Sequence, residues 1–323
     1  MRMLHVLVVM YYVISSPSVY CELCQSTCHI VRVKGLKSAD CYGKELTRIP
    51  QCLSGGIELL DIGHNRIREI FEEDFRPYSY LEHLYLAENI LTDIDEKALE
   101  YLTSLYTLDL SSTALYKIPS GIFSLPVLNK LRLGGIRNPK MVDDIEEASP
   151  VTSPLVYLDL SNNKLKRLPI LGEVPTLEVY NVTSNTNVKL NTTMFAGLCN
   201  LQELVDINFT TTFDSACDCY VLEQWLTARH VKFTRFNCGF PECTNQVPID
   251  DLNIYNSCRR LHEAQQQQIY KKKLLTNVGI SMGTIALFLL IVLYFIIRRH
   301  RKQKKKTEEQ AQKQRKEAID DLL

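Results

Sequence analysis

The stretch LVYLDLSNNKLKRLP, residues 155–169, has the spacing of apolar residues that decides the fold. Leu158 and Leu160 flank an aspartate, an alternation that is typical of a short strand with one buried face. The polar run 161–163 then signals a turn, and two further leucines return to an apolar interior. One such coil cannot bury its own leucines, so the pattern predicts neighbouring coils stacked on both sides.

The pattern does recur along the chain, as L-x-x-L-x-L-x-x-N-x-L read with tolerance. Successive copies start 22 to 27 residues apart, which is the usual range for one unit of this type. The copies start at Ile57, Leu81, Leu105, Leu128, Leu155 and Leu177, with a degraded seventh at Leu201.

An asparagine recurs after the strand, as at Asn65 and Asn89. The turn there leaves buried backbone groups without sheet partners, and an amide side chain can both donate to them and accept from them. Thr113 is a weaker substitute. In the fourth copy Ile136 occupies the asparagine position, and an acidic stretch follows. We therefore expect an irregular coil with a surface excursion near residues 134–153.

These positions resemble the leucine-rich repeat family over residues 57–204. The resemblance implies an α/β solenoid, a horseshoe of six to seven repeats over residues 57–210, with short parallel strands on its concave face. The leucines are then structural, and any binding function lies in the residues between them.

Two apolar segments predict the topology. Residues 1–18 have the charged start, apolar run and small residues of a secretory signal. Residues 274–297 are long enough to span a membrane and carry no charge. Seven Lys or Arg residues follow at 298–306, so the positive-inside rule places the 298–323 tail in the cytoplasm and the repeats outside. Residues 263–273 form the expected stalk.

The eleven cysteines flank the repeats and predict disulfides in an exported chain. We expect cysteine-rich caps at residues 19–56 and 211–262, which cover the ends of the stack. By resemblance to the family's caps, the pairs are Cys21 with Cys28, Cys24 with Cys41, Cys217 with Cys238, and Cys219 with Cys258. Cys52, Cys199 and Cys243 remain, as free thiols or with a Cys199–Cys243 bridge.

Three sequons, at Asn181, Asn191 and Asn208, predict glycans. A glycan on Asn181 would occupy the concave sheet near its C-terminal end and restrict a binding surface to earlier repeats. Tyrosine and arginine are favoured at protein interfaces. The exposed strand positions there give the candidate ligand-binding residues Asp61, His83, Tyr85, Asp109, Lys130, Arg132, Tyr157 and Asp159.

No catalytic, phosphate-binding or metal-ligand motif occurs, so we expect neither an enzyme nor a cofactor, and no nucleic-acid partner. The sequence favours a single-pass type I membrane glycoprotein that binds an extracellular protein ligand or co-receptor. An auxiliary subunit of a channel or receptor complex and an innate immune recognition receptor are alternatives. Gly279 and Gly283 lie four apart in the spanning segment and would allow helix pairing.

Overall fold

The computed structural model describes residues 28–238, 243 and 246–320. The chain divides into two compact units, one up to residue 262 and one from residue 263 onward. The predicted signal segment, residues 1–18, lies outside the described residues.

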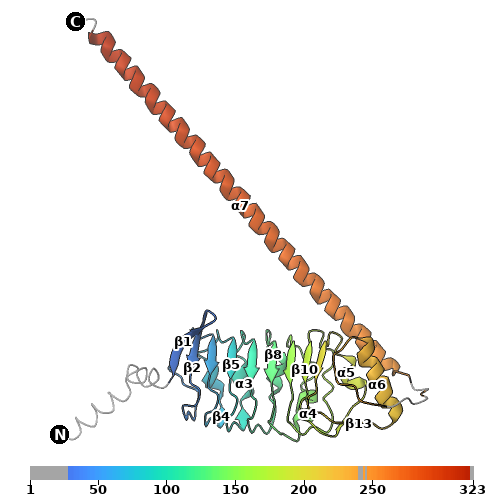
Figure 1. Ribbon diagram of the computed structural model, residues 1–323. Helices are drawn as coiled ribbons and strands as arrows, with labels where there is room; N and C mark the ends of the chain where they lie inside the picture. Colours follow the sequence, from blue (N-terminus) through green and yellow to red (C-terminus); the bar gives the residue numbers. More distant parts are fainter. Residues whose placement is uncertain (1–27, 239–242, 244–245, 321–323) are drawn as a thin grey trace, which may run out of the picture. The chain divides into compact units, whose positions relative to one another are not determined.

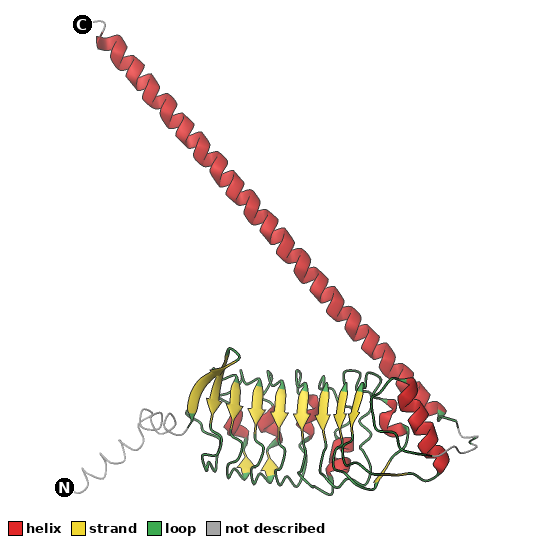
Figure 2. Cartoon of the chain, in the orientation of Figure 1, coloured by secondary structure: helices red, strands yellow, loops and turns green. Residues whose placement is uncertain are grey.

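Among the described residues, the first unit is built around a nine-stranded sheet, to which each repeat contributes one strand (Figures 1 and 2). The first two strands form an antiparallel hairpin in the N-terminal cap, and the following neighbours are parallel. In sheet order the strands are β1 (His29–Val33), β2 (Leu36–Asp40), β3 (Leu59–Asp61), β5 (His83–Tyr85), β7 (Thr107–Asp109), β8 (Lys130–Arg132), β9 (Tyr157–Asp159), β10 (Val179–Asn181) and β12 (Glu203–Val205).

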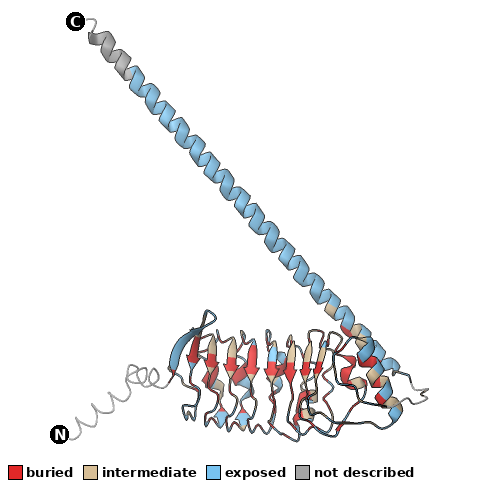
Figure 3. Cartoon of the chain, viewed as in Figure 1, coloured by how far each residue is buried: buried red, intermediate tan, exposed pale blue. Residues whose placement is uncertain are grey.

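The middle residue of each strand of this sheet from β3 onward points into the core, as does its ladder equivalent in β2, and none of these side chains is more than 2% exposed (Figure 3). The first residue of every predicted copy, from Ile57 to Leu201, is buried as well. The predicted register is therefore confirmed. The middle row consists of Ala39, Leu60, Leu84, Leu108, Leu131, Leu158, Tyr180 and Leu204.

The recurring asparagines close the turns as expected. Nδ2 of Asn89 donates to the carbonyl oxygens of Ile62 and Leu86 at 3.0 and 2.9 Å, and Oδ1 accepts from the Ile67 amide at 3.0 Å. One buried amide thus satisfies three backbone groups. Equivalent bonds form at Asn65, Asn163 and Asn185, the last of which the sequence reading did not single out.

The return half of each coil holds short elements on the other side of the core from the nine-stranded sheet (Figure 2). Asp95 is typical, because its side chain caps the helix that follows by accepting from the Lys97 amide at 2.9 Å. The elements are β4 (Glu69–Ile70), η1 (Glu72–Phe75), β6 (Asp93–Ile94), α3 (Glu96–Leu99), η2 (Ser120–Ser124), α4 (Met141–Glu147), β11 (Val188–Lys189), α5 (Thr193–Ala196) and β13 (Thr211–Thr212).

The expected surface excursion at 134–153 is only partly correct. This coil is irregular, but its acidic stretch forms helix α4, which buries Met141 and Ile145 in the core. Asp144 is also buried, and its Oδ2 accepts from the Ile118 amide at 2.9 Å and from Asn138 Nδ2 at 3.0 Å. The apolar residues at positions 141 and 145 lie on one helix face, which is why the segment packs inward.

The C-terminal cap contains helix α6 (Ala216–Ala228). Ser215 caps this helix by accepting from the Asp218 amide at 3.1 Å. Trp225 and Leu226 are buried and close the end of the core.

The predicted cysteine pairing was wrong. Cys217 and Cys219 are two apart on α6, so they point to different sides of the helix and find different partners than the family order implied. Cys199 lies between α5 and β12 and pairs with Cys258, which lies near the start of the last helix, residues 249–320. Cys52 is disulfide-bonded, while Cys21 and Cys24 lie outside the described residues. The pairs are Cys28–Cys41, Cys199–Cys258, Cys217–Cys243 and Cys219–Cys238.

Helix α7 (Ile249–Asp320) follows the cap. It includes residues 263–273, predicted as a stalk, and much of the 298–323 tail, so both segments are helical. The described residues contain one helix that is long and apolar enough, by length and composition, to cross a membrane, and it includes the predicted span at 274–297.

Candidate functional site

The candidate residues lie on the concave face of the nine-stranded sheet, in two rows that flank the buried middle row. The ladder pairs each of them with its predicted equivalent one repeat away. The first row holds Leu59, His83, Thr107, Lys130, Tyr157, Val179 and Glu203, and the second holds Asp61, Tyr85, Asp109, Arg132, Asp159, Asn181 and Val205.

Most of the second row has a structural task that sequence reasoning missed. At the end of each such strand, a carboxylate or amide oxygen accepts from the backbone amide two residues later, which forms an Asx turn. The spacing of Asp or Asn two residues before Gly, Ser or Thr was the available signal in most of these repeats. The accepting residues are Asp40, Asp61, Asp109, Asp159 and Asn181, at 2.8 to 3.1 Å.

Tyr85 and Arg132 interrupt this series, because neither side chain makes such a turn. Arg132 lies between two strands that keep their acids. Its guanidinium is 3.6 Å from Oδ2 of Asp109 and 5.6 Å from the centre of the Tyr157 ring. The Tyr157 hydroxyl donates to Oδ2 of Asp159 at 3.4 Å. Four of the eight candidate residues therefore form one connected cluster across β7, β8 and β9.

The cluster is partly open to solvent. The Arg132 side chain is 35% exposed, whereas that of Asp109 is only 15% exposed. Burial raises the pKa of Tyr157, and the nearby charge of Asp159 raises it further. The Tyr157 phenol therefore stays protonated and can act as a hydrogen-bond donor. An arginine held over an aromatic ring and beside a carboxylate is pre-organised for contact with a partner.

Three candidates lie beside the cluster with fewer contacts. Tyr85 is half-buried and pairs in the ladder with Asp61 and Asp109. Lys130 is exposed. His83 packs edge-on against Tyr106 at 6.0 Å, and its Nδ1 is buried without a hydrogen-bond partner. Burial lowers the pKa of His83, so its ring is neutral near pH 7.

The N-terminal half of the face is acidic. Burial raises the pKa of Asp61, and the charges of Asp40 and Asp109 raise it further, while the hydrogen bond from Gly63 opposes them. Close carboxylates repel one another, so this part of the face favours a cationic group on any partner.

The predicted glycan sites stay predictions. Asn181 borders the cluster, because it pairs with Asp159 in the ladder. Asn191 is exposed just before α5, and Asn208 is exposed with a left-handed φ of 53°.

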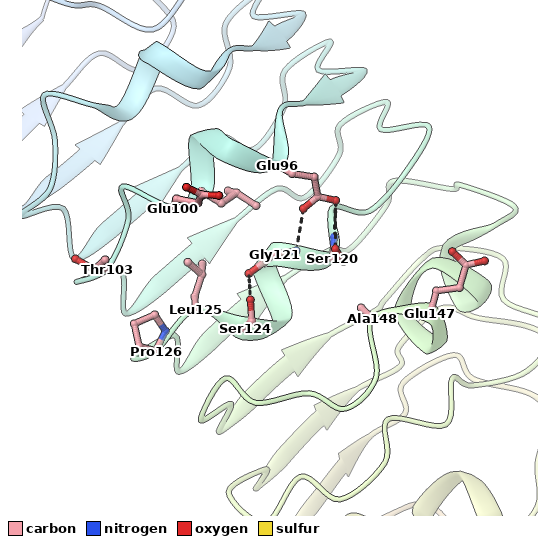
Figure 4. A pocket seen from close by; sticks show the side chains of 11 residues that line it. Glu96, Glu100, Thr103, Ser120, Gly121, Ser124, Leu125, Pro126, Glu147 and Ala148 are labelled. Carbon is pink, nitrogen blue, oxygen red and sulfur yellow. Dashed lines mark hydrogen bonds between the residues drawn. The ribbon is translucent and has the colours of Figure 1, made fainter.

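A hollow of roughly 510 Å³ lies among α3, η2 and the end of α4, on the return side of the coils (Figure 4). Glu96, one of the acids that line it, is hydrogen-bonded to the backbone. Its two carboxylate oxygens accept from the amides of Ser120 and Gly121, both at 2.9 Å. Glu100 and Glu147 also line the hollow. The Ser120 hydroxyl also donates to Glu96, at 3.4 Å. Glu96 thus fixes the start of η2 through two backbone amides and one hydroxyl, which is a structural role.

Comparison with known families agrees with this architecture. Residues 56–115 match the family model "Leucine rich repeat", and residues 154–176 match a second model of that description. The matched segments are leucine-rich repeats. The cysteine-rich caps and the apolar helix of the chain flank the repeats.

The chain is similar to asporin from Bos taurus, at 31% identity over 38% of this chain and 34% of asporin. It is also similar to Toll-like receptor 2 type-1 from Gallus gallus, at 33% identity over 36% of this chain and 14% of the receptor. The chain thus spans about a third or less of these relatives. The structure of the mouse RP105/MD-1 complex aligns with 58% of this chain and 31% of that one, with TM-score 0.49 and 21% identity.

Proposed function

We propose that this protein is a cell-surface recognition or adhesion receptor whose concave face binds a protein ligand or co-receptor. The observation that carries the proposal is the cluster around Arg132, where Asp109 and Tyr157 hold a partly exposed guanidinium in place. Tyrosine and arginine dominate binding energy at protein interfaces, because each offers a large contact area together with polar groups.

The position of the cluster supports this reading. Solenoids present their concave surfaces for recognition, and the cluster lies in the middle of the sheet, on β7 to β9. Tyr85 extends it toward the N-terminal cap on the adjacent strand β5. A glycan on Asn181 would border it on the other side. The expected contact area is therefore the stretch of sheet between Tyr85 and Asp159.

The topology is part of the proposal. Residues 1–18 would direct export, residues 274–297 would span the membrane once, and the basic run at 298–306 would keep the tail in the cytoplasm. The repeats would then face outward as the ectodomain of a type I glycoprotein. The name of the chicken relative, a Toll-like receptor, is consistent with a receptor function, and an innate immune recognition receptor is one form of this proposal.

The competing function is that of an auxiliary subunit in a larger membrane complex. The feature that favours this function is the pair Gly279 and Gly283. An added Cβ at either position would meet no atom within 4 Å. Such small residues let a second helix approach closely. The same surface would serve a helix-mediated dimer.

Proximity labelling on intact cells tests these functions. The labelling enzyme is fused to the full-length chain, and the experiment is repeated with residues 19–262 replaced by an unrelated ectodomain. A recognition receptor loses its extracellular partners with the repeats. Labelling of the same channel or receptor through the remaining helix and tail would instead identify an auxiliary subunit, and Gly279→Leu/Gly283→Leu would then abolish it.

A further inference from the structure

A second surface lies in the loops that follow β7 and β8, away from the two rows of the concave face. These loops enclose a hollow of roughly 470 Å³, here called the Tyr116 hollow. Tyr116 is 77% exposed, the largest exposed fraction among the exposed large hydrophobic residues of the described chain. The hollow is lined by Ala114, Tyr116, Ile136, Arg137, Pro139 and Lys140, together with Leu115 and Asn138.

The loop on one side of the hollow is held in a fixed conformation. Arg137 has a left-handed backbone with φ of 59°, and its amide donates to Oδ1 of Asn163 at 2.9 Å. The buried Asn138 donates from Nδ2 to the Tyr116 carbonyl oxygen and to Asp144, both at 3.0 Å. Its Oδ1 accepts from the Lys140 amide at 2.8 Å. Non-glycine residues with positive φ persist where surrounding structure fixes them.

The cations of this loop have no partners within the described residues. The side chains of Arg137 and Lys140 are exposed and make no ion pair or hydrogen bond there, and the same holds for neighbouring Lys117. By contrast, the guanidinium of Arg167, in the next coil, contacts Asp143 and Glu146.

The nearby acids are largely engaged, so they do not neutralise these cations. Asp144 is buried and accepts from Ile118 and Asn138. The Arg167 hydrogen bond lowers the pKa of Glu146, which keeps that carboxylate charged and paired. Glu147 and Asp143 line an adjoining hollow, which shares Tyr116 and Lys140, and do not line the Tyr116 hollow itself.

We propose that the Tyr116 hollow binds an acidic segment of a protein partner. Carboxylates of that segment pair with Arg137 and Lys140, and one apolar side chain enters the hollow beside Tyr116 and Pro139. Charge complementarity selects the acidic chemistry, since two unpaired cations and no acid line the hollow. The exposed tyrosine and the apolar lining select a peptide with an apolar side chain. The surface is distinct from the concave face and does not depend on the function proposed for it.

The test uses the purified full-length chain in detergent micelles and a random dodecapeptide phage library. Enriched peptides are synthesised, and their dissociation constants are measured by fluorescence anisotropy. The variants are Lys140→Glu and Tyr116→Ser. The matched controls are Lys44→Glu, another exposed lysine without an ion pair, and Tyr80→Ser, another exposed tyrosine. All variants keep the same basic tail, so its attraction for acidic peptides cancels in the comparison.

We expect enriched peptides that combine Asp or Glu with an apolar residue. Lys140→Glu and Tyr116→Ser should each weaken their binding at least about fivefold, and the controls less than about twofold. Tyr85→Ser/Arg132→Ala, on the concave face, should leave it unchanged.

The proposal is overturned if no peptide is enriched, if the enriched peptides lack acidic residues, or if the control or concave-face variants weaken binding equally. Binding of a heparin fragment that requires Lys140 but not Tyr116, without acidic peptides, would assign the surface to sulfated glycans and also overturn it.

Discussion

The second and fourth repeats differ in how the backbone groups of the turn after the strand find hydrogen-bond partners. In the second repeat, Asn89 is buried in the turn. It donates to the Leu86 carbonyl oxygen of its own turn and also satisfies the Ile62 carbonyl oxygen and the Ile67 amide of the first repeat. In the fourth, Ile136 takes that place, so the turn lacks an amide of its own and keeps the bonds that come from the next repeat. Asn163 of the next repeat accepts from the Arg137 amide and donates to the Leu133 carbonyl oxygen.

The difference shows how a repeat departs from its pattern without losing the stack. When the internal amide is absent, the asparagine of the next repeat still satisfies backbone groups of that turn, here the Leu133 carbonyl oxygen and the Arg137 amide. The 27-residue step after Leu128 accommodates helix α4. The departure also has a surface consequence, because the candidate Arg132 and the Tyr116 hollow both belong to this part of the stack.

The largest expected effect tests the buried middle row of the sheet, which the second and fourth repeats share with all the others. Leu158→Asp would place an unpaired charge in the middle row, where the native side chain is fully buried. We expect a loss of more than about 4 kcal/mol in the free energy of unfolding, and therefore no delivery to the cell surface. Leu158→Met, which conserves volume and polarity, is the control. Normal surface levels of the Asp variant, measured by antibody staining of intact cells, would refute the register.

The next substitution separates the two repeats. Asn89→Leu removes the hydrogen-bond partner of the Ile67 amide and of the Leu86 carbonyl oxygen, while the Ile62 carbonyl oxygen keeps its bond from Asn65, and we expect a loss of about 2–4 kcal/mol. Ile136→Asn should not stabilise the protein, because the Leu133 carbonyl oxygen already accepts from Asn163 and the Leu110 carbonyl oxygen from Thr113. Urea unfolding followed by the fluorescence of Trp225, the single tryptophan, measures both. A gain from Ile136→Asn would contradict closure by the neighbouring repeat.

A smaller effect is expected within the fourth repeat. Asp144→Ala removes the acceptor for Ile118 and Asn138, and we expect a loss of about 1–2 kcal/mol. Asp143→Ala is the matched control, because that neighbouring acid is 68% exposed and contacts only Arg167. Equal unfolding midpoints in urea for the two variants would show that α4 does not hold the turn.

The smallest effect concerns the acidic half of the concave face. The pKa of Asp61 is raised in the folded protein, so its ionisation destabilises the fold. This contribution is absent below the unfolded pKa and develops as pH rises through the folded pKa. Asp61→Asn can keep the Gly63 hydrogen bond and should stabilise the protein by less than about 1 kcal/mol at pH 7, since solvent screens a half-exposed charge. The difference in melting temperature from wild type should vanish in acid, and a constant difference would exclude the electrostatic cause.

The features that could be predicted from the sequence are those that recur at a fixed spacing. Copy starts from Ile57 to Leu201 and the capping role of Asn89 follow from residues at fixed spacing, and all are buried as expected. The ladder also aligns the candidate rows, since neighbouring coils must pair in register.

The rest depended on contacts between distant segments. Cysteine pairing is decided by which side of α6 Cys217 and Cys219 face and by how the start of α7 packs on the last coil, and neither leaves a local signal. The acidic residues of α4 suggested a surface segment, although Met141 and Ile145 form a buried face on it. The Asx turns at Asp61 and its equivalents could have been predicted from Asp or Asn two residues before Gly, Ser or Thr. In sequence, however, an aspartate that bonds to its own backbone cannot be told from one that is free to bind a partner.

The central claim is that the concave face around Arg132 recognises a protein. Its most direct test is proximity labelling on intact cells with Tyr85→Ser/Arg132→Ala beside the wild-type chain, at matched surface levels. The account predicts that extracellular partners labelled by the wild type are lost from the variant. The same partners, labelled to the same extent, would place recognition elsewhere on the molecule and contradict it.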